Sequence, residues 1–98
     1  MEKRTAIEKL KARADAVKSM GATSLFLFGS TARDEANGRS DLDLFIDYDP
    51  EVRFSLIDLI SIKQFLEEEL DVEVDLTTRT SLHPQLRNAI ELSAVRVF

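Results

Sequence analysis

The sequence predicts an α/β fold of the α+β type, with a small mixed sheet of three to four strands flanked by helices. Helical and strand-like segments alternate along the chain, which is the pattern of a layered α/β domain. The chain has 98 residues, of which 44% are hydrophobic, and this is enough for one core. No linker or repeat divides it, so we expect a single domain over residues 1–98.

Apolar residues recur with helical periodicity in three segments. The first, residues 2–20, ends at Gly21, a residue that commonly stops helices. Its apolar stripe consists of Ile7, Leu10, Ala14 and Val17. The second helix is expected over residues 55–70 and the third over residues 84–92. Residues 31–36 are expected to form a further short helix.

Four segments fit strands, namely residues 24–28, 42–47, 72–76 and, as a last strand or extended tail, 94–98. The first contains a continuous apolar run that is too short for a helix and suits a strand buried on both faces. The second and third alternate apolar and polar residues, which is typical of strands with one buried face.

Gly29 and Ser30 directly follow the first strand and precede the short helix. A helix N-terminus presents unpaired backbone N–H groups and a positive dipole end, and both attract phosphate. Gly29 lets a bulky anion approach the backbone closely, and Ser30 adds a hydroxyl group that can also cap the helix. Taken alone, such a pair is more typical of a simple turn.

Two carboxylates occupy alternate positions at the start of the second strand. Asp41 and Asp43 share a face, at roughly 6.6 Å between their Cα atoms, because residues i and i+2 of a strand project the same way. Carboxylates at this spacing can bracket two Mg²⁺ ions, and substrate phosphates would complete the coordination. Since Asp is depleted in strands, we interpret the pair as a metal site rather than a solvated strand face.

A third carboxylate lies on the third strand, where Glu73 and Asp75 alternate with apolar residues. If this strand lies beside the second, Asp75 joins Asp41 and Asp43, and three clustered acids repel one another unless a cation is present. Asp75 would then bind a metal ion, accept a proton from an attacking hydroxyl group, or do both. Glu73 shares its face and is the alternative to Asp75.

Two other motifs do not fit. An EF-hand loop beginning at Asp41 would need a glycine at its sixth position and a glutamate at its twelfth, where this chain has Ile46 and Val52. A P-loop is excluded because no Gly-Lys-Ser/Thr sequence follows Gly29.

Composition limits the partners and the location of the protein. The net charge of −5 disfavours direct nucleic-acid binding through phosphates and fits metal binding or a basic protein partner. No apolar run reaches the roughly 18 residues of a membrane span, and the charged N-terminus is unlike a signal peptide, so we expect a cytoplasmic protein. Without cysteine, disulfides and thiolate metal sites are excluded.

The two motifs together resemble the nucleotidyltransferase superfamily that includes DNA polymerase beta. Gly29-Ser30 is followed by Asp41-Leu42-Asp43 and then by an acid on a later strand, which is the order in that superfamily. The length is most similar to the minimal nucleotidyltransferases, or MNT proteins, and the resemblance covers essentially the whole chain.

The resemblance implies a nucleotide site and a metal site. The nucleoside triphosphate would be bound by Gly29, Ser30, Arg33 and Ser40, and two Mg²⁺ ions by the catalytic residues Asp41, Asp43 and Asp75. Arg33 would either contact a phosphate or pair with a site acid, and both interpretations stay open. Asp34 stands where the family usually has glycine, so it either tunes nucleotide affinity or marks a weakened enzyme.

The function implied is metal-dependent transfer of a nucleoside monophosphate, with ATP as the first choice of donor and AMP as the group transferred. The chain has no room for an acceptor domain, so the acceptor hydroxyl group would belong to a partner protein. MNT proteins commonly pair with HEPN-domain toxins as antitoxins, and a HEPN toxin is therefore the expected partner, in a hetero- or homo-oligomer. Two alternatives remain: an inactive module that neutralises a partner by contact, and a small-molecule nucleotidyltransferase.

Three basic residues outside the motifs have no assigned role. Arg39 would reach an acid or solvent, and Arg79 lies just past the third strand, where it could meet a substrate phosphate. His83 precedes a proline at an expected helix start, so turn chemistry is favoured over catalysis.

Overall fold

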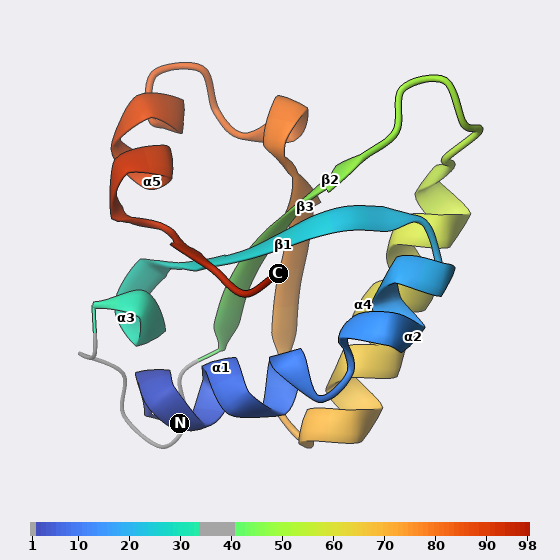
Figure 1. Ribbon diagram of the computed structural model, residues 1–98. Helices are drawn as coiled ribbons and strands as arrows, with labels where there is room; N and C mark the ends of the chain where they lie inside the picture. The colour runs from blue at the N-terminus through green and yellow to red at the C-terminus, as the bar shows by residue number, and fades with distance from the viewer. Residues whose placement is uncertain (1, 34–40) are drawn as a thin grey trace.

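The computed structural model describes residues 2–33 and 41–98 of the chain. Its centre is a four-stranded mixed sheet in the order β3-β2-β1-β4 (Figure 1). The strands are β1 (Ala22–Phe28), β2 (Leu42–Tyr48), β3 (Val74–Thr78) and β4 (Val95–Arg96). β1 runs antiparallel to β2 and β4, whereas β2 and β3 are parallel. The predicted α/β class with a small mixed sheet is confirmed.

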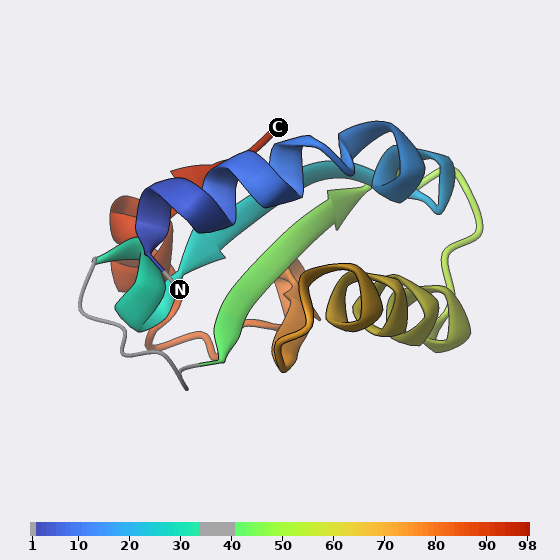
Figure 2. The ribbon, with the colours of Figure 1, turned by 90° about the horizontal axis from the view of Figure 1, so that it is seen from below.

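The helices divide between the two faces of the sheet (Figures 1 and 2). One face is covered by α1 (Lys3–Lys11), α2 (Ala14–Ser19) and α4 (Leu56–Leu70), and the other by α5 (Arg87–Ser93). Two short elements directly follow strands: α3 (Gly29–Ala32) after β1 and the 3-10 helix η1 (Arg79–Ser81) after β3. In the part of the chain that the structure describes, no helix is long and apolar enough to cross a membrane.

The main core lies between the sheet and helices α1, α2 and α4. Its fully buried side chains come from all three helices and from the inward positions of β1 and β2; they are Leu10, Val17, Leu25, Leu27, Leu42, Leu44, Ile46, Ile62 and Leu66. Burying each such side chain contributes about 1.5–3 kcal/mol. The alternation of β2 therefore directs Leu42, Leu44 and Ile46 to this core and Asp43 to the opposite face.

The second face of the sheet has an aromatic layer. Phe45 is fully buried there, and its ring stacks on that of Phe26 with centroids 4.7 Å apart and an interplanar angle of 10°. Phe28 packs against the same ring at 5.7 Å. This layer directly adjoins Asp43, which is two residues from Phe45 on the same strand face.

The single helix predicted over residues 2–20 is wrong, because the structure has two helices with a break at Ala12 and Arg13. The Arg13 backbone N–H donates to the Leu10 carbonyl at 3.0 Å, which tightens the last turn of α1. The Arg13 side chain also donates to the Lys9 carbonyl at 3.0 Å. The break could not be seen in the sequence, because no Gly or Pro marks it and the apolar stripe continues through it.

Two boundaries near the C-terminal half also differ from the prediction. β3 begins at Val74 rather than residue 72, because α4 ends on Asp71 in the left-handed conformation (φ 54°) and the chain must then return to the sheet. α5 begins at Arg87 rather than residue 84. The residues before it form a turn in which the Gln85 N–H donates to Nδ1 of His83 at 3.2 Å, so turn chemistry is confirmed for this histidine.

Helix α4 begins with a capping box. The Asp58 N–H donates to Oγ of Ser55 at 3.3 Å, and the Ser55 N–H donates to Oδ2 of Asp58 at 2.8 Å. The first bond satisfies a backbone N–H group in the first turn, which has no partner within the helix. The second satisfies the N–H group of the N-cap residue itself. Because α4 supplies much of the core, its start should influence the stability of the whole fold.

Removing this cap is expected to destabilise the protein. Ser55→Ala should cost about 1 kcal/mol, which lowers the melting temperature by about 4–8 °C for a domain of this size. The measurement is thermal unfolding followed by circular dichroism. Ser61→Ala is the matched control, because Ser61 is exposed in the middle of α4 and only donates back to the Ile57 carbonyl. Equal effects of the two substitutions would contradict the cap.

Candidate active site

Gly29 forms the junction between β1 and α3 without an intervening loop. Its φ of +74° lies in the left-handed region, which glycine adopts without steric cost. A Cβ atom at this position would also collide with the carboxylate of Asp43. The turn thus requires glycine for two independent reasons, its backbone conformation and the close approach of a carboxylate from β2.

Strand pairing brings residues of β1, β2 and β3 together at this end of the sheet. In the antiparallel pair, Phe28 lies opposite Asp43, and in the parallel pair Asp43 lies beside Asp75. Asp41 directly precedes β2 and is exposed. The adjacency of the second and third strands on which the sequence argument depended is therefore present.

The electrostatics of Asp43 link these residues. Partial burial raises the pKa of its carboxyl group, and the negative charges of Asp75 and Asp41 raise it further. The Arg33 guanidinium acts in the opposite direction and lowers that pKa. Arg33 thus lies within electrostatic reach of a site acid. Glu73 has no such effect on Asp43, which favours Asp75 over Glu73 as the third carboxylate.

The raised pKa of Asp43 predicts how the stability of the metal-free protein varies with pH. Since the folded state favours the protonated group, its contribution is full below the unfolded-state pKa, near 3.8, and is lost as the pH rises through the folded-state pKa. Asparagine does not ionise, so Asp43→Asn removes this pH-dependent loss of stability. In thermal unfolding with a chelator, we expect the variant to exceed the wild type in melting temperature by a gap that widens with pH.

The control for this titration is Asp15→Asn, because Asp15 is exposed in the first turn of α2. Because Asp15 is exposed and lies outside the candidate site, its loss should give no widening advantage. If the Asp43→Asn gap stays constant or narrows as the pH rises, the raised pKa of Asp43, caused by burial and by its acidic neighbours, is contradicted.

Several predicted site residues are placed differently or lie outside the described part. Ser30 does not cap α3, whose N-cap is Phe28 without a side-chain hydrogen bond, so that expectation is wrong. The reason is that the helix begins at Gly29, one residue before the serine. Ser40, Asp34 and Arg39 lie outside the residues that the structure describes.

The carboxylates fit Mg²⁺ by their donor chemistry. Mg²⁺ prefers oxygen ligands and is usually held by one or two carboxylates together with substrate phosphates, rather than by a cage made only of protein. Within residues 2–33 and 41–98, no group of three or more His, Cys, Asp or Glu side chains that could hold a metal ion is found, so Asp41, Asp43 and Asp75 do not form such a group in this structure. Asp43 and Asp75, with Asp41 beside them, can supply the protein part of such a site.

Arg79 has a structural environment that the sequence analysis missed. Its guanidinium donates to Asp47 through Nε at 2.8 Å and through Nη2 at 3.0 Å, and Nη1 lies 3.2 Å from Glu91 of α5. These nitrogens are therefore engaged by carboxylates instead of being available for a phosphate. A signal for this contact is the spacing of the two residues. Asp47 and Arg79 are 32 residues apart, which is also the spacing of register partners in the parallel β2–β3 pair, such as Phe45 and Thr77.

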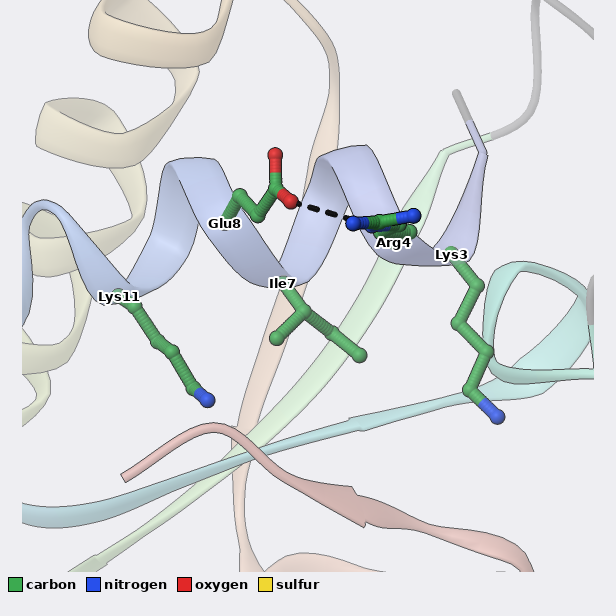
Figure 3. A pocket seen from close by; sticks show the side chains of 5 residues that line it. All are labelled: Lys3, Arg4, Ile7, Glu8 and Lys11. Carbon is green, nitrogen blue, oxygen red and sulfur yellow. Dashed lines mark hydrogen bonds and ion pairs between the residues drawn. The ribbon is translucent and has the colours of Figure 1, made fainter.

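One hollow on the described surface is separate from these acids. It has a volume of about 390 Å³ and follows the exposed side of α1, where Lys3, Ile7 and Lys11 project toward β1 and the C-terminal segment (Figure 3). Arg4 and Glu8 also line it and form an exposed ion pair at 3.3 Å. None of the site carboxylates lines it, so this hollow is not part of the candidate active site.

The fold and this arrangement of a glycine turn beside paired strand carboxylates are those of a nucleotidyltransferase. A solved structure provisionally described as a minimal nucleotidyltransferase superimposes with a TM-score of 0.74 at 36% identity, over 97% of this chain and 95% of that one. The family model named nucleotidyltransferase domain matches residues 7–97. The chain belongs to this family and is a nucleotidyltransferase enzyme.

Similar curated proteins have more specific names. MJ0126 of Methanocaldococcus jannaschii, provisionally named a protein adenylyltransferase, is 41% identical over 69 residues, which cover 69% of this chain and 68% of that protein. The protein adenylyltransferase MntA of Thermococcus cleftensis is 32% identical over 77 residues, covering 79% of this chain and 76% of MntA.

Two more distant structures share the fold. A toxin–antitoxin complex with AMP-PNP matches with a TM-score of 0.72 at 19% identity, over 90% of this chain and 72% of that one. The MNT antitoxin in complex with the tri-AMPylated HEPN toxin of Shewanella oneidensis matches with a TM-score of 0.64 at 18% identity, over 90% and 68%. At these identities the likeness concerns the fold.

Proposed function

We propose that this chain transfers AMP from ATP to a hydroxyl group of a HEPN-family toxin and thereby acts as its antitoxin in the cytoplasm. The observation that supports this most is the meeting of the Gly29 turn with the Asp43–Asp75 pair. The names of the relatives from M. jannaschii and T. cleftensis support protein adenylylation. The HEPN toxin complex among the structural neighbours supports the kind of partner.

Each candidate residue has a definite role in this proposal. Asp41, Asp43 and Asp75 would hold two Mg²⁺ ions, which supply charge neutralisation at the α-phosphate and at the leaving pyrophosphate. Gly29 leaves space for the triphosphate beside the backbone, and Ser30 donates a hydrogen bond to it. Arg33 and Ser40 complete the nucleotide site.

The reaction is an in-line displacement at the α-phosphorus. The acceptor oxygen forms a bond to that phosphorus while the bond to the bridging oxygen of the β-phosphate breaks, and pyrophosphate leaves with the electron pair. Asp75 accepts the proton of the acceptor hydroxyl group. The chain contributes mainly positioning and electrostatic stabilisation, because no covalent intermediate is needed.

Labelled ATP tests this proposal. The purified chain is incubated with Mg²⁺ and the protein encoded beside it, using ATP labelled either at the α- or at the γ-phosphate. Transfer of AMP predicts label on the partner from the α-phosphate only. Label from the γ-phosphate would indicate a kinase reaction, and no label with a stable complex would favour an inactive binding module. Turnover of a small molecule without the partner would favour the third hypothesis.

A further inference from the structure

Strands β2 and β3, together with the residue that follows β3, bring two pairs of charged side chains to the same face of the sheet. At one end, the like charges Asp43 and Asp75 are register partners. Four residues further along, Asp47 of β2 and Arg79, the residue that directly follows β3, form an ion pair of opposite charges with the same offset of 32 residues. The offset of the parallel register, which ends at Ile46 and Thr78, therefore continues into this ion pair.

The ion pair has strong geometry. Arg79 donates to both carboxylate oxygens of Asp47, at 2.8 and 3.0 Å, and bidentate pairs of this kind are among the strongest hydrogen-bonded contacts in proteins. The side chains are about two-thirds buried, with exposed fractions of 31% for Arg79 and 33% for Asp47. Solvent therefore screens this pair less than a fully exposed one.

Arg79 also joins β1 and α5 to the same point. Its guanidinium carbon lies 4.7 Å from the centroid of the Phe26 ring and 5.0 Å from that of the Phe45 ring. Its Nη1 lies 3.2 Å from Glu91 of α5. We call Arg79 with Asp47 and Glu91 the Arg79 bridge. It fixes the far end of β2 and β3 against the aromatic layer.

The opposite end of the same strand pair is under electrostatic repulsion. Like charges that face each other across two strands destabilise the pairing, although the Arg33 guanidinium acts on Asp43 in the opposite direction. A strand can respond by separating or by slipping in register, and a slip of one residue turns every side chain to the other face. The Arg79 bridge opposes both movements.

We propose that Arg79 is a positioning residue, which holds the β2–β3 register so that Asp43 and Asp75 face each other before a divalent cation binds. This inference rests on the proposed metal-binding function of these carboxylates. It assigns Arg79 no contact with the nucleotide. A guanidinium is needed for the role, because lysine provides neither two parallel N–H donors nor a planar group that stacks on both phenylalanine rings.

The inference is tested by titration calorimetry, which measures the direct binding of Mn²⁺ to the nucleotide-free chain. Arg79→Gln and Arg79→Lys should both raise the dissociation constant about tenfold, as is common when residues that orient metal ligands are changed. The sign of the effect is diagnostic. If Arg79 acted only through long-range electrostatics, removing its positive charge would tighten cation binding. If Arg79 positions the carboxylates, its loss weakens cation binding.

Arg4→Gln is the matched control, since it removes the same charge and also breaks an ion pair. Its side chain is 90% exposed on α1 and pairs with Glu8, so the Mn²⁺ affinity should stay at the wild-type value or increase slightly. All measurements use a temperature at which circular dichroism shows each variant to be folded. Arg79→Lys retains the charge, which provides a second variant if Arg79→Gln does not fold.

The possible results separate this inference from the proposed function. Mn²⁺ binding to the wild type with weaker binding to the Arg79 variants supports the inference. Wild-type binding with unchanged or tighter affinity in the Arg79 variants overturns the inference and leaves the proposed function intact. Absence of Mn²⁺ binding to the wild type overturns the proposed function, and the inference with it.

Discussion

Asp43→Asn is expected to reduce AMP transfer to the partner by about 100- to 1,000-fold, the loss typical of removing one preorganised electrostatic group. Asp43 lies between its register partner Asp75 and the Gly29 turn, so it is the central carboxylate of the candidate site. An asparagine side chain keeps the shape but has no charge for a divalent cation. The fold should remain intact, because Asp43 is only partly buried and repels its acidic neighbours.

The measurement is the initial rate of AMP transfer at several Mg²⁺ concentrations, together with the melting temperature of each metal-free protein. Asp15→Asn serves as the control, because Asp15 is an exposed acid on α2. Loss of activity without loss of stability is the expected combination. An Asp43→Asn variant with wild-type transfer rates would show that this carboxylate does not bind a catalytic metal ion.

Gly29→Ala is expected to cause the largest loss of stability among single substitutions at the site. An L-residue in the left-handed conformation costs about 1–2 kcal/mol, and forcing a methyl group into a filled space costs about 1–3 kcal/mol more. The new Cβ would collide with the carboxylate of Asp43, so the site acid must also move. The melting temperature should fall by about 10 °C or more, and AMP transfer should be lost.

A double-mutant cycle separates the two causes of this loss. Asp43→Ala removes the carboxylate that the new methyl group would strike, whereas the backbone strain at Gly29 remains. The double variant should therefore be more stable than the sum of the single effects predicts, by about 1–3 kcal/mol measured in chemical denaturation. Strict additivity would indicate that Gly29 is required for its backbone conformation alone.

Local patterns were sufficient to predict the elements that form the candidate site. Alternation in β2 and β3 predicted strands with acids on one face, and the apolar run before Gly29 predicted the strand that precedes the turn. These features could be read from the sequence because side chains of a strand alternate between faces. The order β3-β2-β1 then brought the separate motifs to one end of the sheet.

Features that depend on contacts distant in sequence were not predicted. The role of Arg79 follows only from the parallel register that places it beside Asp47, 32 residues away, and from the approach of α5. The break between α1 and α2 depends on backbone hydrogen bonds at Arg13 that no Gly or Pro announces. Ser30 failed as a cap because the helix begins at Gly29, two residues earlier than expected.

The central claim is that the carboxylates at the Gly29 turn catalyse transfer of AMP to a protein. Mass spectrometry of the proposed HEPN partner tests it most directly, after incubation with ATP, Mg²⁺ and either the wild-type chain or Asp43→Asn. We predict that the wild type adds AMP to a hydroxyl side chain of the partner and that the variant does so about 100- to 1,000-fold more slowly. A partner that is neutralised by the wild type without gaining mass would contradict the claim.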